Sequence, residues 1–527
     1  MSPATRISEP GGQLPNSLPL ERFLRQVRPL PIEARYTLVE QALVLLDSLY
    51  VHLRLKRAMH AVDPVQRLRL LQRRLEDLSD AQFQAELIAT FRSLRDLHTI
   101  YQLPDPYRGN VATLGLLIER YHAGKDHKPH FLVTKMHSAL AYGQFRPGVE
   151  VLTWNGVPIE RALELNADRQ AGSNPDARLA RGLEALTLRP LRTTLPPDEH
   201  WVILEWQAPS GQRGETRLQW RVMPAATSSG GRPQDPVSTI AAALAIDAGN
   251  EATRQVKRAL FAPRRAQLAA PQELHSVLRV DEVSYRSRRR GYLRIFSFNV
   301  SSGRRFAEAI SRLLTQLPQD GLIIDIRGNP GGLIPAAEAA LQLLTVGTVT
   351  PCRFSLATTP LVLALCNANP ALRAWAPSVA AAVETGEAYS QGFSLSAVAE
   401  LTEGLPRYPG PVVLVTDPLC YSAADIFAAG FQDNKIGTIV GTARRTGAGG
   451  ANVWTHDLIR LWLPELTAQL PDGTGFRLAL RRTTRVNDND GVALEDLGVS
   501  ADHLHYLSKR DITGENEDLI AAAASQL

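Results

Sequence analysis

Cysteine is scarce in this chain of 527 residues, which has only Cys352, Cys366 and Cys420. An odd number of cysteines at these spacings argues against a disulfide framework, and it fits no zinc-binding pattern. We therefore expect three buried thiols. The alternative is a single bridge between Cys352 and Cys366.

Long apolar runs are also lacking, and none approaches the roughly 20 residues that a membrane-spanning helix needs. The opening stretch, "MSPATRISEPGGQLPNSLPL", has an early arginine but no apolar core behind it, so it does not resemble a secretory signal. We expect a flexible tail over residues 1–19 and a cytoplasmic protein, unless a leader has been removed.

Aromatic residues make up only 6% of the chain, and the net charge is +5. Basic clusters such as "SRRRGYLR" and "APRRAQ" come without a nucleic-acid-binding motif or interleaved aromatic residues, so we interpret them as solvated surface. The hydrophobic content of 44% and the charged content of 21% are those of an ordinary globular protein. The length predicts about two to four domains, and no nucleic-acid partner or membrane span is expected.

The spacing of the apolar residues changes along the chain. Apolar residues three and four positions apart predict a helical N-terminal domain over residues 20–100. Short strands follow, and "GVEVLTWNGVPI" contains an Asn155-Gly156 hairpin turn, so residues 129–225 are predicted to form a β-rich domain. A linker with helices is expected over residues 226–280.

The last part of the chain, residues 281–510, alternates strands with helices. This order predicts an α/β fold, a sheet flanked by helices, with functional sites at the carboxyl ends of the strands. A largely helical insertion is expected over residues 352–409, and a C-terminal helix over residues 511–527.

Two strand ends in this α/β part have features of a catalytic site. "GLIIDIRGNPGG" runs from a buried strand into Gly331 and Gly332, whose N–H groups can stabilise an oxyanion because no side chain covers them. A plain glycine turn is the alternative, and a phosphate loop is disfavoured because no lysine follows. In "VVLVTDPLCYSAADIFAAGFQDN", Ser422 stands at a helix start. It is either an N-cap paired with Asp425 or a nucleophile beside the Ala423 N–H.

Taken in order, "GYLRIFSF", "GLIIDIRGNPGG" and "SAADIFAAGFQDN" resemble the motifs of the C-terminal processing (tail-specific) serine peptidases. The resemblance implies a crotonase-like catalytic core with Ser422 as the nucleophile, and Asp425 replaces the usual glutamate of the family. "FRPGVEVLTWNGVPIERAL" is similar to the core of a PDZ domain, which implies an inserted PDZ-like domain that holds extended peptide ends. A β-domain that acts only as a spacer is the alternative.

The resemblance also concerns the general base that would accept the proton of Ser422. In the bacterial branch a lysine follows the serine, but Gly447 and Ala448 stand in the corresponding phrase, "VGTARRTGAGGANVW". Arg444 and Arg445 cannot replace that lysine, because a guanidinium group stays protonated. Lys435 is expected in a solvated loop. A Ser–Lys dyad is therefore disfavoured.

The tricorn-core-like branch uses a histidine base, and "RDLHTIY" resembles its histidine phrase. The resemblance implies His98 as the general base, with Leu97 in place of a supporting serine. "GVALEDLGVSADH" resembles the closing phrase of the family, which implies Glu495 as the supporting acid and Asp496 as its rival. His456 is the alternative base.

The implied activity is that of a serine endopeptidase acting on peptides or unfolded proteins, without a metal or another cofactor, and a homo-oligomer remains open. Two alternatives remain. The missing lysine, Asp425 and Leu97 also fit a catalytically inactive peptidase fold that binds peptides as a scaffold. A crotonase-like acyl-CoA enzyme shares the oxyanion chemistry, but the PDZ-like stretch disfavours it.

Overall fold

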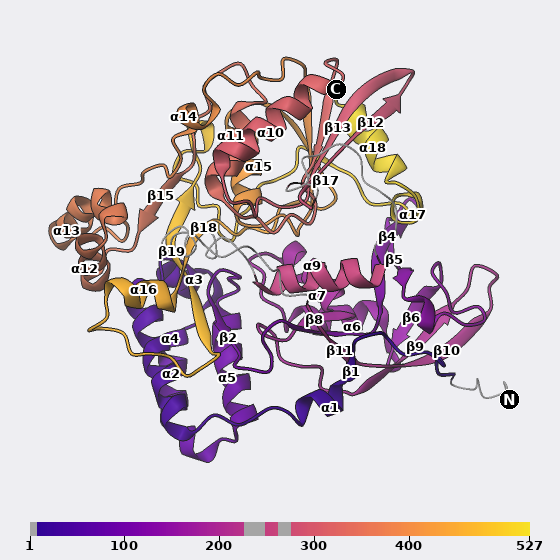
Figure 1. The fold of residues 1–527 in the computed structure, drawn as a ribbon, viewed down its shortest axis with the longest axis horizontal. Coiled ribbons are helices and arrows are strands. Elements are labelled where there is room, and N and C mark those ends of the chain that lie inside the picture. The colour runs from indigo at the N-terminus through magenta and orange to yellow at the C-terminus, as the bar shows by residue number, and fades with distance from the viewer. Residues whose placement is uncertain (1–7, 226–247, 262–273, 275) are drawn as a thin grey trace.

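The structure is a computed structural model that describes residues 8–225, 248–261, 274 and 276–527. Figure 1 shows N-terminal helices at the lower left, a β-rich domain at the lower right and an α/β core above both. Within these ranges, no helix combines the length and the apolar character that crossing a membrane requires.

The N-terminal helices pack through their apolar faces, and two of them begin at a side-chain cap. The Asp63 side chain accepts the Gln66 N–H at the start of α4, and Ser79 and Gln82 form a reciprocal capping box at the start of α5. The elements are α1 (Leu20–Leu24), α2 (Ile32–Val44), the π-helical turn η1 (Leu45–Leu49), α3 (Leu53–His60), α4 (Pro64–Gln72) and α5 (Asp80–Ser93).

The segment before these helices corrects one prediction. Residues 8–19 do not form a flexible tail, because Leu14 is buried and β1 (Leu18–Pro19) pairs antiparallel with β11 (Arg221–Pro224). Apolar side chains hold this segment on the β-rich domain. They are separated irregularly by polar and glycine residues, so no periodicity in the sequence predicts this packing. Residues 1–7 lie outside the described residues.

Two sheets form the β-rich domain, one in the order β10-β9-β6-β5-β4 with β7 paired to β6, the other in the order β1-β11-β3-β8. Their further strands are β3 (Asn110–Thr113), β4 (Leu116–Ala123), β5 (Lys128–Met136), β6 (Glu150–Trp154), β7 (Val157–Pro158), β8 (Leu188–Pro190), β9 (Trp201–Gln207) and β10 (Arg213–Gln219). Asn155 and Gly156 connect β6 to β7 with positive φ at both residues, as the hairpin pattern predicts. The larger sheet includes β4, which precedes residue 129.

Three helices accompany these sheets: α6 (Ile159–Ala167), α7 (Pro175–Ala185) and α9 (Ala248–Phe261). α6 packs on α7, and α9 packs on β3 and β8. Most of the linker expected over residues 226–280 lies outside the described residues.

The core sheet has the order β12-β13-β14-β16-β17-β20, and all its neighbours are parallel except β12 and β13. Its strands are β12 (Leu278–Tyr285), β13 (Arg288–Ile295), β14 (Leu322–Asp325), β16 (Val412–Thr416), β17 (Gly437–Gly441) and β20 (His503–Leu504). Its helices include α10 (Gly303–Gln316), α11 (Ile334–Gln342), α14 (Val398–Thr402) and α15 (Ala423–Asp433). The predicted C-terminal helix is two short helices, α17 (Lys509–Thr513) and α18 (Glu517–Ala524).

Alternate side chains of the central strands pack on opposite faces of the sheet, as expected for a sheet covered on both faces. Ile323 and Val413 belong to a cluster with Leu519 of α18. Ile324 and Leu414 belong to the main core with the helices α10, α11 and α15. Burial on both faces explains why these strands are continuous apolar runs in the sequence.

A second sheet connects the N-terminal helices to the core. It has the order β15-β19-β18, and the three-residue strand β2 pairs with β19. Its strands are β2 (Ile100–Gln102), β15 (Arg353–Leu356), β18 (Ala451–Thr455) and β19 (Gly475–Thr484). The Ala479 N–H also donates to Thr99 Oγ1, and the Ala479 carbonyl accepts the Val51 N–H.

The segment expected as a helical insertion over residues 352–409 contributes β15 to this second sheet before it turns helical at α12 (Pro360–Ala368) and α13 (Ala376–Thr385). All three cysteines are free and buried, so the predicted thiols are confirmed and the alternative bridge is not formed.

Glu338 of α11 makes core stability dependent on pH. It is 1% exposed, its Oε1 accepts the Cys352 N–H at 3.1 Å, and burial raises its pKa to about 7. Since the pKa in the folded state lies above the unfolded value of 4.5, the contribution of Glu338 is complete below the unfolded pKa and is lost as pH rises through 7. We predict that this group alone lowers the free energy of unfolding by about 3 kcal/mol between about pH 4.5 and pH 8.

The variant Glu338→Gln keeps an oxygen acceptor but cannot ionise, so its free energy of unfolding should vary less over this range. Urea unfolding at about pH 5 and about pH 8 measures the difference. Glu400→Gln, at an exposed position of α14, is the matched control. An unchanged pH dependence in Glu338→Gln would contradict the prediction.

Candidate active site

The two strand ends singled out from the sequence lie side by side, because β14 and β16 are neighbours in the parallel sheet. Hydrogen bonds join the turns that follow them. The Tyr421 N–H donates to the Asn329 carbonyl at 3.0 Å, and the Gly328 N–H donates to Asp417 Oδ1 at 2.8 Å. The glycine motif and the serine turn therefore form one rigid unit.

Ser422 has a strained backbone, with φ 60° and ψ −124°, a conformation that residues other than glycine rarely adopt. It is half-buried, and its side chain makes no capping hydrogen bond to α15. The Ser422 side chain therefore does not cap α15, although the Asp425 carboxylate does accept a backbone hydrogen bond from Ser422. The same carboxylate also accepts the N–H groups of Ala448 at 3.2 Å and Gly449 at 2.8 Å. Burial raises the pKa of Asp425 to about 6. The strain is maintained by the surrounding turn, which leaves the Ser422 hydroxyl uncommitted to the helix.

Glycine is required at both positions of the motif beside this serine. A Cβ atom on Gly331 would lie 2.5 Å from the Ser422 Cβ and 2.8 Å from the Ala423 nitrogen. On Gly332, whose φ is +140°, a Cβ atom would lie 2.1 Å from the Phe298 carbonyl carbon. The absence of side chains therefore keeps the space in front of the Ala423 N–H open.

The N–H groups around this space differ in their bonding. The Gly331 N–H donates to Asn329 Oδ1 at 2.9 Å, so it is engaged within the turn. Within the part of the chain that the structure describes, the N–H groups of Gly332 and Ala423 have no hydrogen-bond acceptor. Two uncommitted donors thus lie beside Ser422, as an oxyanion site requires.

The phrase "VGTARRTGAGGANVW", which lacks the lysine of the bacterial branch, supports the serine turn through backbone contacts. The Gly447 N–H donates to the Cys420 carbonyl at 2.7 Å, and a side chain on Gly449 would collide with the Tyr421 ring. Lys435 lies on the surface, where it pairs with Asp488 at 2.9 Å, as the solvated-loop prediction expected.

His98 lies against the residue that precedes Ser422. Its buried ring is 4.6 Å from the Tyr421 ring, centroid to centroid, and the Leu97 N–H donates to the Tyr421 hydroxyl at 3.1 Å. Asp96 Oδ1 accepts the His98 N–H at 2.7 Å and fixes the local turn. In contrast, His456 begins α16 (His456–Trp462), where its Nε2 lies 3.0 Å from Gln41 Oε1 of α2.

Glu495 is fully buried, and one of its two carboxylate oxygens accepts hydrogen bonds. Its Oε1 accepts hydrogen bonds from Lys56 Nζ at 2.6 Å and from Ser173 Oγ at 2.9 Å. Asp496 accepts from Lys56 at 2.8 Å and lies 3.2 Å from His60 Nε2. Burial alone would lower the pKa of Lys56, but the neighbouring carboxylates outweigh it and raise that pKa, so Lys56 stays protonated and cannot act as a base.

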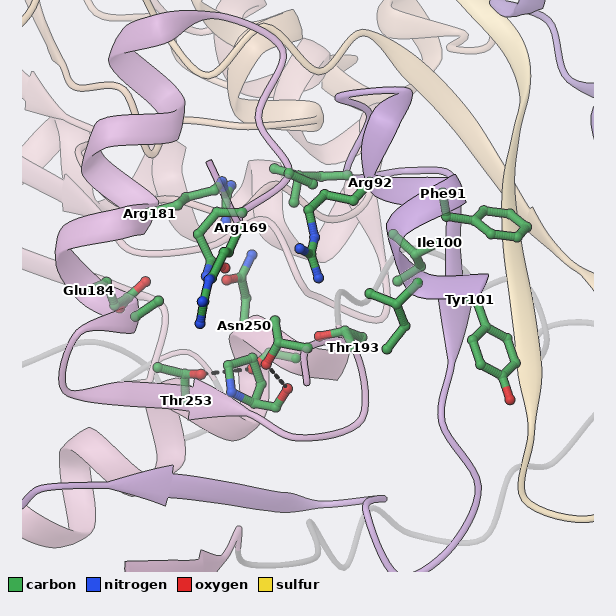
Figure 2. Close-up of a pocket in the computed structure, with 18 of the residues that line it drawn as sticks. Phe91, Arg92, Ile100, Tyr101, Arg169, Arg181, Glu184, Thr193, Asn250 and Thr253 are labelled. Atoms are coloured by element: carbon green, nitrogen blue, oxygen red, sulfur yellow. Dashed lines mark hydrogen bonds between the residues drawn. The ribbon is translucent and has the colours of Figure 1, made fainter. Parts of the chain in front are cut away.

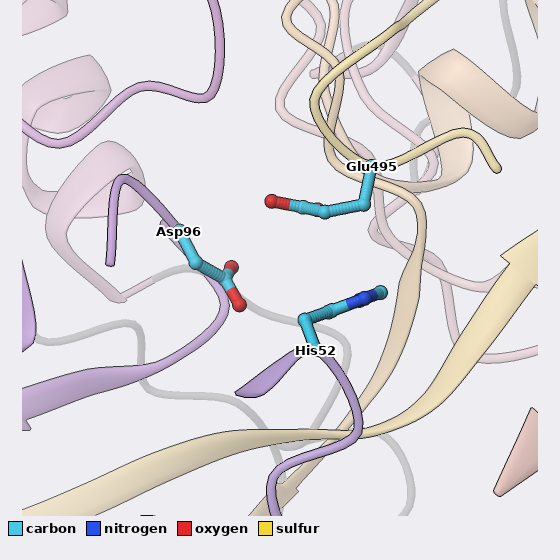
Figure 3. A group of neighbouring side chains, drawn as sticks. All are labelled: His52, Asp96 and Glu495. Carbon is cyan, nitrogen blue, oxygen red and sulfur yellow. The ribbon is translucent and has the colours of Figure 1, made fainter. Parts of the chain in front are cut away.

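Glu495 also faces Asp96 and His52. Each of the three side chains offers one atom that could bind a cation, these atoms lie within 4.8 Å of one another, and Figure 3 shows them arriving from three separate segments. Burial lowers the pKa of His52 to about 3, so its ring is neutral. Because Lys56 Nζ already binds Glu495 directly, we interpret the cluster as an ion-pair network balanced by Lys56.

This network could not be predicted from the sequence. Lys56 lies in "HLRLKRAMH", where the charges are spaced as on a solvated helix face, and Ser173 and His52 belong to no motif. These residues matter only because α3 and the segment before α7 both contact the loop that carries Glu495 and Asp496.

Lys56 is predicted to be essential for stability. Lys56→Met would leave two buried carboxylates without their cation, which should lower the free energy of unfolding by about 3–5 kcal/mol. Lys435→Met, which removes an exposed ion pair, should change it by no more than about 0.5 kcal/mol. Urea unfolding of both variants measures the difference, and equal effects would contradict a structural role for the buried pair.

Comparisons with known proteins agree with this geometry. Residues 289–504 match the model of peptidase family S41, and no curated protein sequence matches the chain significantly. Among solved structures, mature CPAF is similar with a TM-score of 0.67 at 18% identity, covering 94% of this chain and 97% of that chain. CPAF complexed with lactacystin is similar with a TM-score of 0.65, also at 18% identity, covering 94% and 98%.

The photosystem II D1 C-terminal processing protease matches with a TM-score of 0.39 at 16% identity, covering 90% of this chain and 93% of that chain. At such identities the solved structures establish the fold alone. The family match is more specific, because its residues include both the glycine motif and the Ser422 turn. Residues 289–504 therefore form a domain of peptidase family S41, the tail-specific peptidases, which are serine-type peptidases.

Proposed function

We propose that the protein is a serine endopeptidase that cleaves peptide bonds through an acyl-enzyme. Ser422 Oγ attacks the scissile carbonyl, and His98 accepts its proton and later donates a proton to the leaving amine. Water then releases the acyl group. Glu495 supports the base, and the core is of the crotonase-like kind.

The observation that carries this proposal is the strained Ser422, uncapped and next to two uncommitted N–H donors. A preorganised donor pair of this kind stabilises the tetrahedral oxyanion, since it needs no rearrangement as negative charge develops. We assign this role to the N–H groups of Gly332 and Ala423. Gly331 provides clearance, and its own N–H would join the oxyanion site by leaving Asn329.

A histidine base fits the surroundings better than a lysine base. His98 lies against Tyr421, whereas Lys56 is held protonated by carboxylates and Lys435 is on the surface. Glu495 Oε2 accepts no hydrogen bond within the described residues, so it remains available to orient the imidazole directly or through water. This assignment follows the tricorn-core-like branch.

The proposed substrate is a peptide or an unfolded protein segment. The β-rich domain is proposed to act as a PDZ-like module, because the β6 to α6 stretch has its strand, turn and helix in the expected order. Such a module holds an extended peptide by adding it as a strand to a sheet edge.

Ser422→Ala tests the nucleophile. We predict that kcat for a fluorogenic peptide falls by at least about 10⁴-fold and that fluorophosphonate labelling disappears, because no other group supplies the attacking oxygen. Ser210→Ala, at an exposed position, is the matched control and should keep both signals. Turnover that survives in Ser422→Ala sinks the assignment, and a folded wild type that resists the probe favours the inactive-scaffold alternative.

Replacing each histidine separately tests the base. We predict that His98→Ala lowers kcat by at least about 10³-fold, whereas His456→Ala, which removes packing contacts with Gln41 and Phe476, keeps kcat within about threefold. Steady-state kinetics with the same peptide measures both, and circular dichroism checks that both variants fold. A larger loss in His456→Ala would reverse the assignment.

A further inference from the structure

Two hollows lie near the glycine motif, the serine turn and the His98 segment. One hollow, of about 120 Å³, has Gly328, Pro330 and Leu419 in its wall, together with Arg181. A second hollow, of about 90 Å³ and drawn in Figure 2, shares Arg181 and includes Leu97 from the His98 segment. The two hollows share wall residues and therefore adjoin; together they are called the cleft, and its wall includes residues next to the proposed active site but not Ser422 itself.

Three arginine side chains gather in this cleft from separate elements. Arg92 comes from α5, Arg169 follows α6, and Arg181 comes from α7. Figure 2 shows Arg92 and Arg169 extending from opposite sides into the same space. The Arg181 guanidinium lies 5.3 Å from the centre of the ring of Tyr421, the residue that directly precedes the proposed nucleophile Ser422.

The positive charge of this cluster is largely unneutralised. Arg169 pairs with Asp198 at its exposed side, but neither Arg92 nor Arg181 has a carboxylate partner among the residues that the structure describes. Burial, together with Arg169 and other arginines nearby, lowers the pKa of Arg92 to about 10, which leaves it charged at neutral pH.

The acidic residues of the cleft wall do not cancel this charge. The Asp96 carboxylate accepts hydrogen bonds from the hydroxyls of Tyr50 and Thr99, and Glu184 forms an ion pair with Lys257. Glu184 is therefore neutralised by Lys257, and the cation that most strongly lowers the pKa of Asp96 is Lys56 of the buried network, not an arginine of the cleft. Guanidinium groups bind carboxylates through paired, charge-assisted hydrogen bonds, so the cluster is suited to an incoming carboxylate.

We propose that this cleft is a substrate subsite that binds a carboxylate group of the peptide, and that Arg92 and Arg181 determine this preference. The inference rests on the proposed peptidase function. The carboxylate comes either from an acidic side chain near the scissile bond or from the free C-terminus of the substrate, since both present the same two oxygens.

The test uses sets of fluorogenic peptides that differ only in charge. One set replaces each residue around the cleaved bond with Glu or Gln, and the other compares a free with an amidated C-terminus. For wild type we expect kcat/KM for the preferred carboxylate peptide to exceed that of its neutral partner by at least about tenfold. The set that shows the preference identifies the source of the carboxylate.

In Arg92→Gln and Arg181→Gln this ratio should fall to about one, and Arg92→Lys, which keeps the charge but not the planar fork, should retain part of it. Arg305→Gln, at an exposed position of α10 away from the cleft, should leave the ratio unchanged. With two positions replaced independently, failure of one variant to fold does not end the test.

A binding measurement separates this inference from the proposed mechanism. Fluorescence anisotropy of the same peptides with Ser422→Ala, alone and combined with Arg92→Gln, reports the carboxylate preference without turnover. Equal affinity of Ser422→Ala for charged and neutral partners in both sets would overturn the subsite, even if wild type reacts with a fluorophosphonate. Absence of that reaction, with the preference retained, would overturn the mechanism and leave the subsite.

Discussion

The pairing of β2 with β19 is the constraint on which the proposed active site depends. One residue separates His98 from β2, and β19 belongs to the second sheet, which also contains β15 and β18. The hydrogen bond from the Ala479 N–H to Thr99 adds a side-chain contact at the same place. A segment from the N-terminal domain is thereby held at a fixed position next to Tyr421, hundreds of residues away in sequence.

Strain at Ser422 is sustained by its neighbours. Two turns exchange hydrogen bonds, Asp425 receives N–H groups from the following loop, and glycines remove every side chain that would collide. Backbone strain of this kind persists only where the surrounding structure fixes it several times over. The Asp425 that departs from the family pattern is therefore a structural residue here, because it anchors the loop that packs against Tyr421.

The sequence could predict elements whose pattern is local. The buried strands β14 and β16, the amphipathic α10 and the Asn155-Gly156 turn all follow from periodicity and turn chemistry. It also predicted that Ser422 and the glycine pair follow strand ends, which the structure places next to each other. It could not predict that residues 8–19 pack on the β-rich domain, or that Lys56 is buried, because such positions depend on contacts between distant segments. Nor could it identify the engaged Gly331 N–H, since one amide side chain, Asn329, decides that bond.

Charge is separated around Tyr421. The network of Asp96, Glu495 and Asp496 holds more acids than its single Lys56 neutralises, and the cleft with Arg92 and Arg181 holds the opposite excess. Burial and the acidic charges raise the pKa of Tyr421 well above its usual range, so its phenol stays neutral. Its ring contacts both the His98 imidazole and the Arg181 guanidinium.

An acidic network can stabilise an imidazolium that forms during catalysis, whereas an arginine cleft would oppose it. A neutral aromatic ring in contact with both groups is therefore a suitable boundary, because it would separate the proposed carboxylate subsite from the proposed base without adding a formal charge between them.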